Sequence, residues 1–278
     1  MNSTVGPVAV VGLGCIGGSL ARVLAERHAQ VRTWSDALVD RDLADDARLP
    51  VAASAAEAMR GAALIVIAVP LPAINTVAAR AREAAPGAVI LHTGGLQGAG
   101  VLGIPAALHA HVIGTHPLAG SHSSGFGASR ADLFSGCTVS IEARADARVR
   151  AAAEALWRLA GAARFDYREA GEHDLLMAWV SHLPQLAATA LAGALAATGI
   201  AARDGGPGLH DTTRLAMSSL ELWQPLLAPA RRELDVALAA LETRLGELRR
   251  AIASRDAEQL ALLWESARAW RLTAGERP

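Results

Sequence analysis

Up to residue 167 the chain alternates between short apolar runs and segments in which apolar residues recur every three or four positions. The short runs predict seven β-strands, at residues 8–11, 31–34, 62–69, 88–91, 112–113, 138–141 and 163–166. The run at 62–69 is apolar throughout and stops at Pro70, as is typical of a strand buried on both faces of a parallel sheet. Helices are predicted after the first run, from near Pro72 and at 147–159. The pattern therefore predicts an α/β domain.

Beyond residue 167 the alternation stops, and only helical patterns remain. Helices are predicted at residues 172–198, 211–219, 229–253 and 256–272, with a glycine-rich loop at 205–208. The most apolar stretch, residues 175–200, is interrupted by Ser181, His182, Pro184 and Gln185, so it predicts a buried, kinked helix rather than a membrane span. We therefore place the boundary near Tyr167, between an α/β domain at 1–167 and an all-α domain at 168–278.

The helix predicted at 229–253 carries an apolar seam. Its members recur at spacings of four and three residues and are Leu234, Leu238, Leu241, Leu245, Leu248 and Ile252. Such a seam has to be covered by another helix. Two arrangements provide one, either the 256–272 helix of the same chain or the helices of a second copy. We favour a homodimer built through the C-terminal helices.

A glycine-rich turn follows the first strand. Gly12 permits a tight turn, Gly14 lets a pyrophosphate approach the backbone, and Gly17 allows the next helix to pack closely on the strand. This pattern predicts a Rossmann domain that binds NAD or NADP. The predicted cofactor-binding residues are this turn and the residues that follow three other strands: Gly12, Leu13, Gly14, Cys15, Ile16, Gly17, Ser35, Asp36, Val69, Pro70, Thr93 and Gly94.

The end of the second predicted strand leaves the choice of dinucleotide open. A carboxylate at Asp36 would bond the ribose hydroxyls of NAD, whereas Ser35 with the nearby Arg41 would accommodate the 2′-phosphate of NADP.

Composition narrows the classes of partner. The net charge of −1 provides no basic surface, so we expect neither nucleic acid nor an anionic membrane as a partner. All 26 basic residues are arginines, which excludes a lysine nucleophile and leaves anions to guanidinium groups and backbone N–H. The two cysteines, Cys15 and Cys137, form no disulfide framework, and residues 1–7 lack a charged signal-peptide region, so we expect a cytoplasmic protein.

Three groups of polar residues are candidates for chemistry. His116 follows the fifth strand, where ligands of open parallel sheets bind, and a histidine there can accept a proton as hydride leaves the neighbouring carbon. His182 and Gln185 share one side of an apolar helix and either satisfy each other or line a cleft. Asp211 and Arg214 form either an ion pair or a site in which the arginine binds a substrate carboxylate.

A group of histidines raises the question of a metal site. The group comprises His109, His111, His116 and His122. It lacks helical His-x3-His spacing and an accompanying carboxylate, so we predict no metal.

Four blocks together resemble the prephenate and arogenate dehydrogenase family over nearly the whole chain. The blocks are the glycine turn through Ala21, Thr115–Gly120, Glu172–Asp174 leading into Val180–Gln185, and Asp211–Ala216. The resemblance implies a Rossmann domain followed by a helical dimerisation domain. It also implies NAD(P)-dependent oxidative decarboxylation of a cyclohexadienol dicarboxylate or amino acid on the way to tyrosine.

Roles for individual residues follow from the same resemblance. His116 is implied to accept the hydroxyl proton. Arg214 is implied to bind a substrate carboxylate, with Asp211 orienting it. His182 and Gln185 are implied to line the pocket.

Several positions depart from the family pattern, which usually has Asp-x-Gly-Ser-x-Lys where this chain has His92-Thr93-Gly94-Gly95-Leu96-Gln97. Gly95 stands where the family usually has a serine that supports the catalytic histidine, and Thr93, Thr115 and Ser121 are candidates to replace its hydroxyl. His210 replaces a common arginine. Gly95, Gln97 and His210 leave open a dehydrogenase of an amino-substituted prephenate analogue. The alternative from another class is a nucleotide-sensing dimer that keeps the fold without catalysis.

Overall fold

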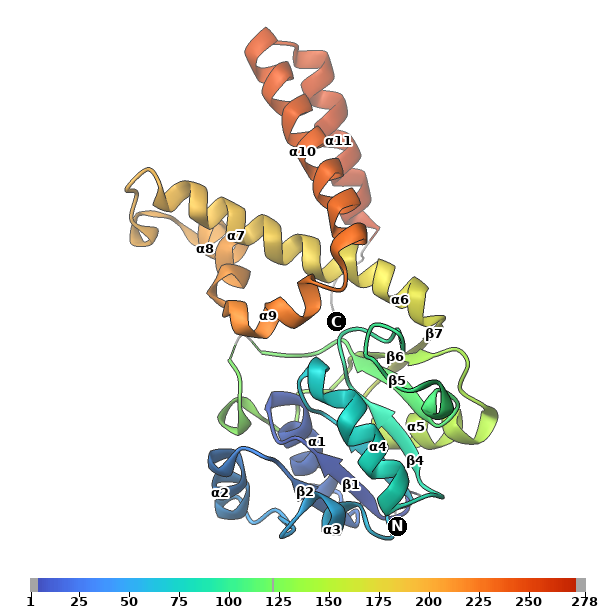
Figure 1. The fold of residues 1–278 in the computed structure, drawn as a ribbon. Coiled ribbons are helices and arrows are strands. Elements are labelled where there is room, and N and C mark those ends of the chain that lie inside the picture. The colour runs from blue at the N-terminus through green and yellow to red at the C-terminus, as the bar shows by residue number, and fades with distance from the viewer. Residues whose placement is uncertain (1–4, 122, 274–278) are drawn as a thin grey trace. The chain divides into compact units, whose positions relative to one another are not determined.

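The structure is a computed structural model that describes residues 5–121 and 123–273. The chain divides into two compact units, Met1–Ala230 and Arg231–Pro278. The first unit holds the whole sheet and the helices up to residue 227 (Figure 1). The expected boundary near Tyr167 falls inside this unit and stays a prediction.

A seven-stranded sheet in the order β2-β1-β3-β4-β5-β6-β7 forms the centre of the first unit. Its strands are β1 (Val8–Val11), β2 (Val31–Trp34), β3 (Leu64–Ile67), β4 (Val89–His92), β5 (Val112–Pro117), β6 (Thr138–Glu142) and β7 (Arg164–Arg168). All neighbouring strands are parallel except β5 and β6, which run antiparallel. The α/β class and each predicted strand are confirmed.

The fifth strand is longer than predicted. It continues to Pro117, because His116 pairs with Ser140 and Pro117 with Val139 of the antiparallel neighbour β6. His116 therefore lies inside a strand rather than beyond its end. The apolar pattern stopped at residue 113, since polar and glycine residues that pair with a distant strand carry no local signal.

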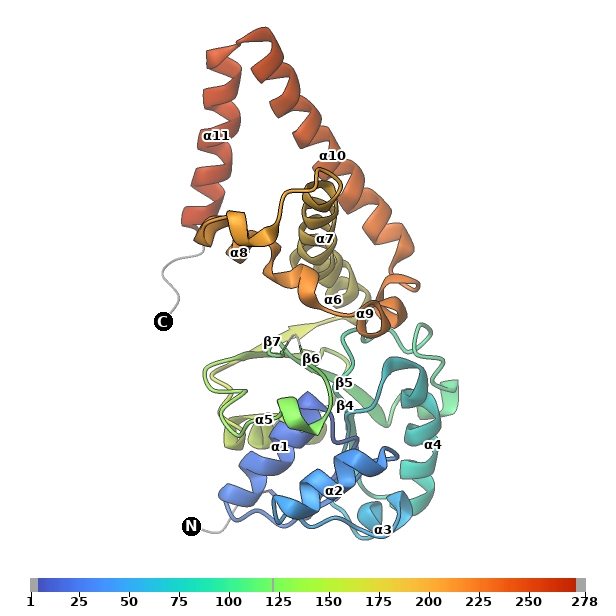
Figure 2. The same cartoon turned by 90° about the vertical axis from the view of Figure 1, so that its left-hand side faces the viewer.

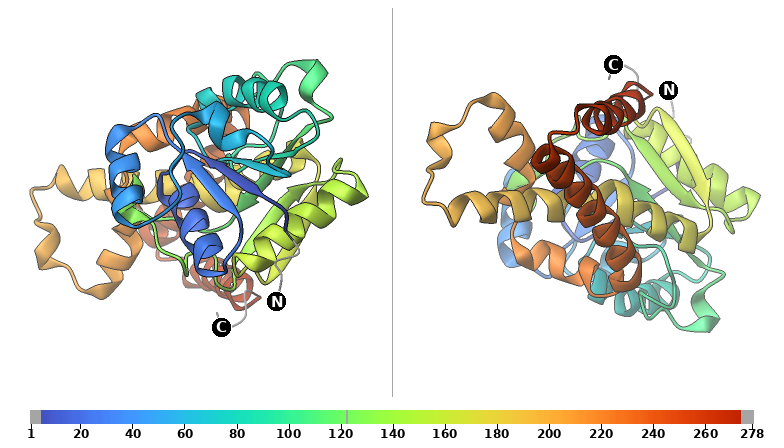
Figure 3. Two further views of the ribbon diagram at one scale, coloured as in Figure 1. Left: turned by 90° about the horizontal axis from the view of Figure 1, so that it is seen from below. Right: turned by 90° about the horizontal axis from the view of Figure 1, so that it is seen from above.

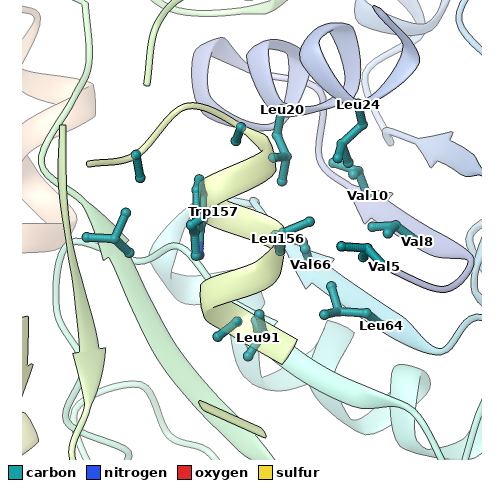
Figure 4. Close-up of a cluster of buried hydrophobic side chains, with 14 of the residues drawn as sticks. Val5, Val8, Val10, Leu20, Leu24, Leu64, Val66, Leu91, Leu156 and Trp157 are labelled. Atoms are coloured by element: carbon teal, nitrogen blue, oxygen red, sulfur yellow. The ribbon is translucent and has the colours of Figure 1, made fainter. Parts of the chain in front are cut away.

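Side-chain alternation buries both faces of the sheet. Val8, Val10 and Leu64 face helices α1 (Cys15–Glu26) and α5 (Ala147–Leu159), as Figure 4 shows. The intervening residues, among them Ala9 and Ile65, face α3 (Ala55–Met59) and α4 (Ile74–Ala84). In Figure 3 (left) the blue α1 and yellow-green α5 lie on one side of the strands and the teal α4 on the other. Helices thus cover both faces, as in a doubly wound fold.

Short helices complete this part of the chain. They are α2 (Leu38–Asp46) and the 3₁₀ turns η1 (Leu71–Ala73), η2 (Ala106–Leu108), η3 (Phe126–Ala128) and η5 (Ala202–Asp204).

The helix predicted at 172–198 is one continuous helical segment, Ala170–Ala196. It comprises α6 (Ala170–Met177), a π-helical turn η4 (Ala178–His182) and α7 (Leu183–Ala196). Pro184 has no N–H to donate to the carbonyl one turn earlier, so the regular hydrogen-bond ladder is interrupted just where the π turn lies. The predicted irregularity near Pro184 is therefore a π turn.

Burial along this segment differs from the expectation. Met177, His182 and Gln185 are buried, whereas Leu175, Val180 and Leu191 are exposed, so the prediction of a buried helix is correct for only one side of the segment. By length and mean hydropathy (1.3) it is the one helix among residues 5–121 and 123–273 that could cross a membrane, with 28% of its apolar window buried. One such helix is weak evidence, and its buried polar residues belong to the site described below.

The next helices are shifted from their predicted ranges. Helix α8 (Pro207–Thr213) begins within the expected glycine-rich loop, because Pro207 occupies the first turn after Gly206. A 3₁₀ turn, η6 (Arg214–Met217), and a short helix, α9 (Leu220–Leu227), follow. The single helix predicted at 211–219 is therefore wrong.

The second unit contains α10 (Arg231–Ser254) and α11 (Ala257–Leu272), which contact each other (Figure 2). Asp256 caps α11 by accepting a hydrogen bond from Gln259 N at 2.9 Å. Both helices lie close to their predicted ranges. Leu245 and Ile252 of the seam are nevertheless 56% and 64% exposed, so α11 of the same chain does not cover it fully.

Candidate active site

The glycine turn between β1 and α1 has the geometry of a phosphate cradle. Gly12 has φ +96°, and a Cβ on it would lie 2.4 Å from Ala68 O. A Cβ on Gly17 would lie 1.9 Å from Gly12 O, whereas one on Gly14 would meet no atom within 4 Å. No acidic residue occupies the first turn of α1. Open space at Gly14 and free N–H groups at a helix N-terminus fit a dinucleotide pyrophosphate.

The other predicted cofactor positions share an edge with this turn. Ser35 and Asp36 follow β2, Val69 and Pro70 follow β3, and Thr93 and Gly94 follow β4. The strands β2, β1, β3 and β4 are parallel neighbours, so their carboxyl ends lie at one edge of the sheet. This edge is where ligands of open α/β sheets bind.

Both candidate determinants of cofactor choice are present at the end of β2. The Asp36 carboxylate is exposed and accepts a hydrogen bond from Trp34 Nε1 at 3.3 Å. The Arg41 guanidinium lies 4.3 Å from the centre of the Trp34 ring and donates to Asp36 O at 3.1 Å. The geometry keeps both NAD and NADP open.

The loop between β5 and β6 is tied to α1 by three hydrogen bonds. Arg130 N donates to Ser19 Oγ at 3.0 Å, Arg22 Nε donates to Ser129 Oγ at 2.8 Å, and the Cys15 thiol lies 3.6 Å from Ala128 O. Burial raises the pKa of the Cys15 thiol, and the nearby Arg130 guanidinium opposes that shift. Arg130 is therefore held close to the glycine turn.

A pocket of about 660 Å³ opens beside His116 within the first unit. Its lining residues are His116, Leu118, Ala119, Gly120, Ser121, Ala128, Arg130, Met177, Val180, Ser181, Gln185, Arg214, Leu215, Ser218, Leu222 and Trp223.

Four residues predicted from the sequence therefore share this pocket: His116, Ser121, Gln185 and Arg214. Sequence reasoning missed Arg130, which comes from a loop whose pattern indicates no role. Trp223 was missed as well, because α9 was not predicted.

His116 is held by a neighbouring histidine. Its Nδ1 lies 3.1 Å from His173 Nε2, and the two rings meet edge to face with centroids 5.2 Å apart. Burial, and next the His173 and His182 rings, lower the pKa of His116 to about 3, against the opposing effect of the Asp174 carboxylate. His116 is thus an uncharged base at neutral pH.

Asp174 holds His173 and is itself fixed by backbone groups. His173 Nδ1 lies 2.9 Å from Asp174 Oδ1, and His173 is fully buried. Gln97 N donates to Asp174 Oδ1 at 2.8 Å, and Gly98 N donates to Oδ2 at 3.0 Å. In the sequence, His173 and Asp174 belong to a block shared with the family, but no role was predicted for either residue. The fold brings them to His116.

Two predicted residues lie outside the pocket lining. His182 is buried with its ring edge-on to Trp223, at 5.8 Å between centroids, and burial lowers the pKa of His182. Asp211 is exposed in α8, and among the described residues no ion pair joins it to Arg214. The position of Asp211 therefore gives no support for an orienting role in this state.

None of the three candidate hydroxyls reaches His116 with a hydrogen bond among the described residues. Thr115 Oγ1 donates to His92 O at 3.1 Å, and Ser121 Oγ accepts from Ser123 N at 3.1 Å. Thr93 makes no side-chain hydrogen bond in the described part of the chain. His173, rather than a hydroxyl, is the side chain that His116 contacts.

The histidine group considered for a metal is dispersed. His109 Nε2 lies 2.7 Å from Ile104 O, His111 is exposed, and His122 lies outside the described residues. Within residues 5–121 and 123–273 no three His, Cys, Asp or Glu side chains form a group that could hold a metal ion.

Models of two protein domains match this chain. The model described as "Prephenate dehydrogenase, nucleotide-binding domain" matches residues 20–162, and "Prephenate dehydrogenase, dimerization domain" matches residues 169–265. The cyclohexadienyl dehydrogenase of Zymomonas mobilis is 31% identical over 267 residues, which cover 91% of this chain and 90% of that protein.

Solved structures show the same fold. The prephenate dehydrogenase of A. aeolicus, in complex with hydroxyphenyl propionate and NAD+, superposes with a TM-score of 0.87 at 22% identity, over 99% of this chain and all of that one. The arogenate dehydrogenase of Synechocystis gives a TM-score of 0.79 at 23% identity, over 96% of this chain and 99% of that one. Together with the sequence matches, the glycine turn and the His116 pocket, this shows that the chain belongs to the prephenate dehydrogenase family.

Proposed function

We propose that this chain catalyses the NAD(P)-dependent oxidative decarboxylation of prephenate or arogenate. The observation that carries the proposal is a pocket lined by both an uncharged His116 and Arg214, in a unit that also holds a dinucleotide cradle. Its chemistry combines a proton acceptor, a carboxylate-binding group and a hydride acceptor. The relatives named above carry the corresponding activities in their names.

The pocket provides cations for an anionic substrate. Arg214 and Arg130 are the arginines in its lining, and a guanidinium can bind a carboxylate with two parallel hydrogen bonds. We assign the side-chain carboxylate to Arg214, which comes from the helical part of the unit. Ser121 and Gln185 line the same pocket and provide polar contacts, while His182 supports its wall through Trp223.

His116 performs the proton transfer. Its low pKa keeps the ring uncharged, so it accepts the proton of the ring hydroxyl as the C–H bond at the same carbon breaks. A dinucleotide held by the glycine turn would supply the hydride acceptor for that carbon. The ring carboxylate then leaves as CO2 and its electron pair completes the aromatic ring, while His116 returns the proton to the phenolic oxygen. Aromatisation makes the reaction favourable.

We further propose a homodimer through the C-terminal helices. Leu262, Trp264 and Trp270 of α11 are all more than 60% exposed, in addition to Leu245 and Ile252 of α10. Apolar surface of this kind on a single chain is typical of an interface. The family model that matches residues 169–265 is described as a dimerization domain. Cys15 and Cys137 are free thiols, which supports a cytoplasmic location.

A second candidate is the dehydrogenation of a prephenate analogue that carries an amino group in place of the ring hydroxyl. Gly95 favours it, because the family serine that contacts the substrate hydroxyl is missing there. A Cβ on Gly95 would have only Leu226 side-chain atoms within 4 Å.

The test is an absorbance assay at the reduced-nicotinamide band with prephenate or arogenate, each with NAD+ or NADP+. We expect turnover in at least one of the four reactions, with one CO2 released per reduced cofactor. A His116→Asn variant serves as the control and should show no turnover. Cofactor binding without turnover in all four reactions would refute the proposal and favour the nucleotide-sensing dimer, unless the amino-substituted analogue is turned over.

A further inference from the structure

We propose that His173 and Asp174 are positioning residues that fix the tautomer of His116. The inference rests on the proposed function in that His116 is the base. It concerns two side chains that are outside the pocket lining and act only through His116.

The order of hydrogen bonds determines where the protons are. The Asp174 carboxylate can only accept, so His173 Nδ1 donates to it across 2.9 Å. The His173 Nε2 of a neutral ring is then an acceptor, and His116 Nδ1 must donate to it across 3.1 Å. His116 Nε2 is left unprotonated. It is the nitrogen that remains for the pocket, and it has the lone pair that a proton acceptor needs.

The Asp174 carboxylate, at one end of this series of hydrogen bonds, is held rigidly. Its two oxygens accept hydrogen bonds from the backbone N–H groups of Gln97 and Gly98, at 2.8 Å and 3.0 Å. Backbone donors do not rotate, so the carboxylate keeps one orientation toward His173. His173 is fully buried, which excludes water from competing for either of its nitrogens.

The backbone donors that hold Asp174 lie in the same loop as Gly95, the position of the missing serine. Gln97 and Gly98 lie two and three residues after Gly95 in the same loop after β4. In this chain the loop supports His116 through two backbone N–H groups, Asp174 and His173. The hydroxyls of Thr115 and Ser121 are engaged elsewhere.

The arrangement also accounts for the charge that forms during the reaction. When His116 accepts a proton it becomes a buried imidazolium, which is costly without a partner. The Asp174 carboxylate offsets that cost across His173, and its charge is the one that raises the pKa of His116 against burial.

Asp174→Asn tests the proposal. An asparagine has no charge, and it can present either its oxygen or its amide N–H to His173 Nδ1, so the proton of His173 is no longer confined to Nδ1 and that of His116 is no longer confined to its Nδ1. We expect kcat to fall about 10²- to 10⁴-fold, the range reported for misoriented or wrongly protonated catalytic histidines. The dissociation constant for NADH should change less than threefold, because Asp174 lies outside the glycine turn.

The tautomer itself is measured by NMR of 15N-labelled histidine, with the His116 signals assigned by their loss in His116→Asn. In the unaltered protein we expect the proton on Nδ1 of His116, and in Asp174→Asn a mixture of molecules protonated on Nδ1 and on Nε2. A purely structural role for Asp174 would not move this proton. The measurement needs no substrate, so it stands even if none of the proposed substrates is turned over.

Two substitutions at position 173 and one control complete the design. His173→Gln keeps an acceptor for His116 and should retain most of the activity that His173→Leu loses. Thr115→Val removes a buried hydroxyl one residue from His116 and should leave kcat within threefold. The proposal is overturned if His116 carries its proton on Nε2 in the unaltered protein. It is also overturned if Asp174→Asn and His173→Leu keep kcat within threefold.

Discussion

Two glycines of the phosphate turn, Gly14 and Gly17, should respond in opposite ways to the same substitution. A Cβ on Gly17 would lie 1.9 Å from Gly12 O and 2.9 Å from Ala68 Cβ, so α1 has to move away from β1. Overpacking of this kind costs about 1–3 kcal/mol. For a unit of this size each kcal/mol lowers Tm by about 2–4 °C. We therefore expect Gly17→Ala to lower Tm by about 2–12 °C.

Gly14→Ala should leave the free protein almost unchanged. A Cβ there meets no atom within 4 Å, and the backbone at φ −69°, ψ −165° suits alanine. Alanine is a poorer N-cap than glycine by about 0.5–1 kcal/mol, while its lower backbone entropy in the unfolded chain contributes about 0.4–1 kcal/mol in the other direction. The two nearly cancel. The new methyl group, however, occupies the space through which a pyrophosphate approaches the backbone.

Thermal unfolding with and without cofactor separates the two effects. A ligand at 100 times its Kd stabilises the folded state by about 2.7 kcal/mol, and a tenfold weaker Kd removes about 1.4 kcal/mol of that. Gly14→Ala should keep the Tm of the free protein and lose at least about half of the cofactor-induced increase. An unchanged cofactor-induced increase in Gly14→Ala would refute the assignment of the turn. So would a Tm in Gly17→Ala equal to that of the unaltered protein.

Four further outcomes are expected. Asp36→Ser should shift the ratio of kcat/KM for NADP+ over NAD+ upward at least tenfold, because the carboxylate repels a 2′-phosphate; an unchanged ratio would place the ribose elsewhere. Arg214→Met should raise KM for the substrate about 10- to 150-fold, from a charge-assisted hydrogen bond of about 1.5–3 kcal/mol, and an unchanged KM would remove Arg214 from the site. Gly95→Ser should raise kcat less than twofold if His173 already holds His116, and a tenfold gain would count against that role. The pKa of His116 is about 3 and that of His92 about 4, so kcat should not fall on acidification from about pH 8 to 5, and a loss of kcat centred near pH 6.5 would contradict this. The free energy of unfolding should decrease as the pH falls below about 6.5, because the unfolded chain then binds more protons than the folded one.

Features that depend on neighbouring residues in the chain could be predicted from the sequence. The strand, glycine turn and helix at residues 8–26 form one local unit, and its apolar spacing and glycines indicate both structure and ligand. The edge that collects Ser35, Thr93 and His116 also followed, since parallel strands place their carboxyl ends together. The alternation and periodicity of apolar residues were sufficient to predict an element wherever that element buries one face or both.

Features that depend on tertiary packing could not be predicted in this way. His173 lies 57 residues from His116, and nothing in the spacing indicates that their rings meet. Arg130 reaches the pocket because its loop is pinned to Ser19, a side chain that a pattern assigns only to the inner face of α1. Both α8 and η6 pack against α7, and this tertiary packing competes with a helical pattern that continues to residue 219.

The π turn at Ala178–His182 has an evolutionary consequence. A π turn holds one more residue than an α turn, so deleting any one of the five would remove the extra residue and leave a helix interrupted only at Pro184. The same deletion would rotate α7 by about 100° relative to α6 and carry Gln185 away from the side on which His173 reaches His116. Regularity of this helix and assembly of the pocket are therefore in conflict. Descendants of this gene can exchange residues along the segment, but its length between His173 and Gln185 is fixed by the need to keep both in register.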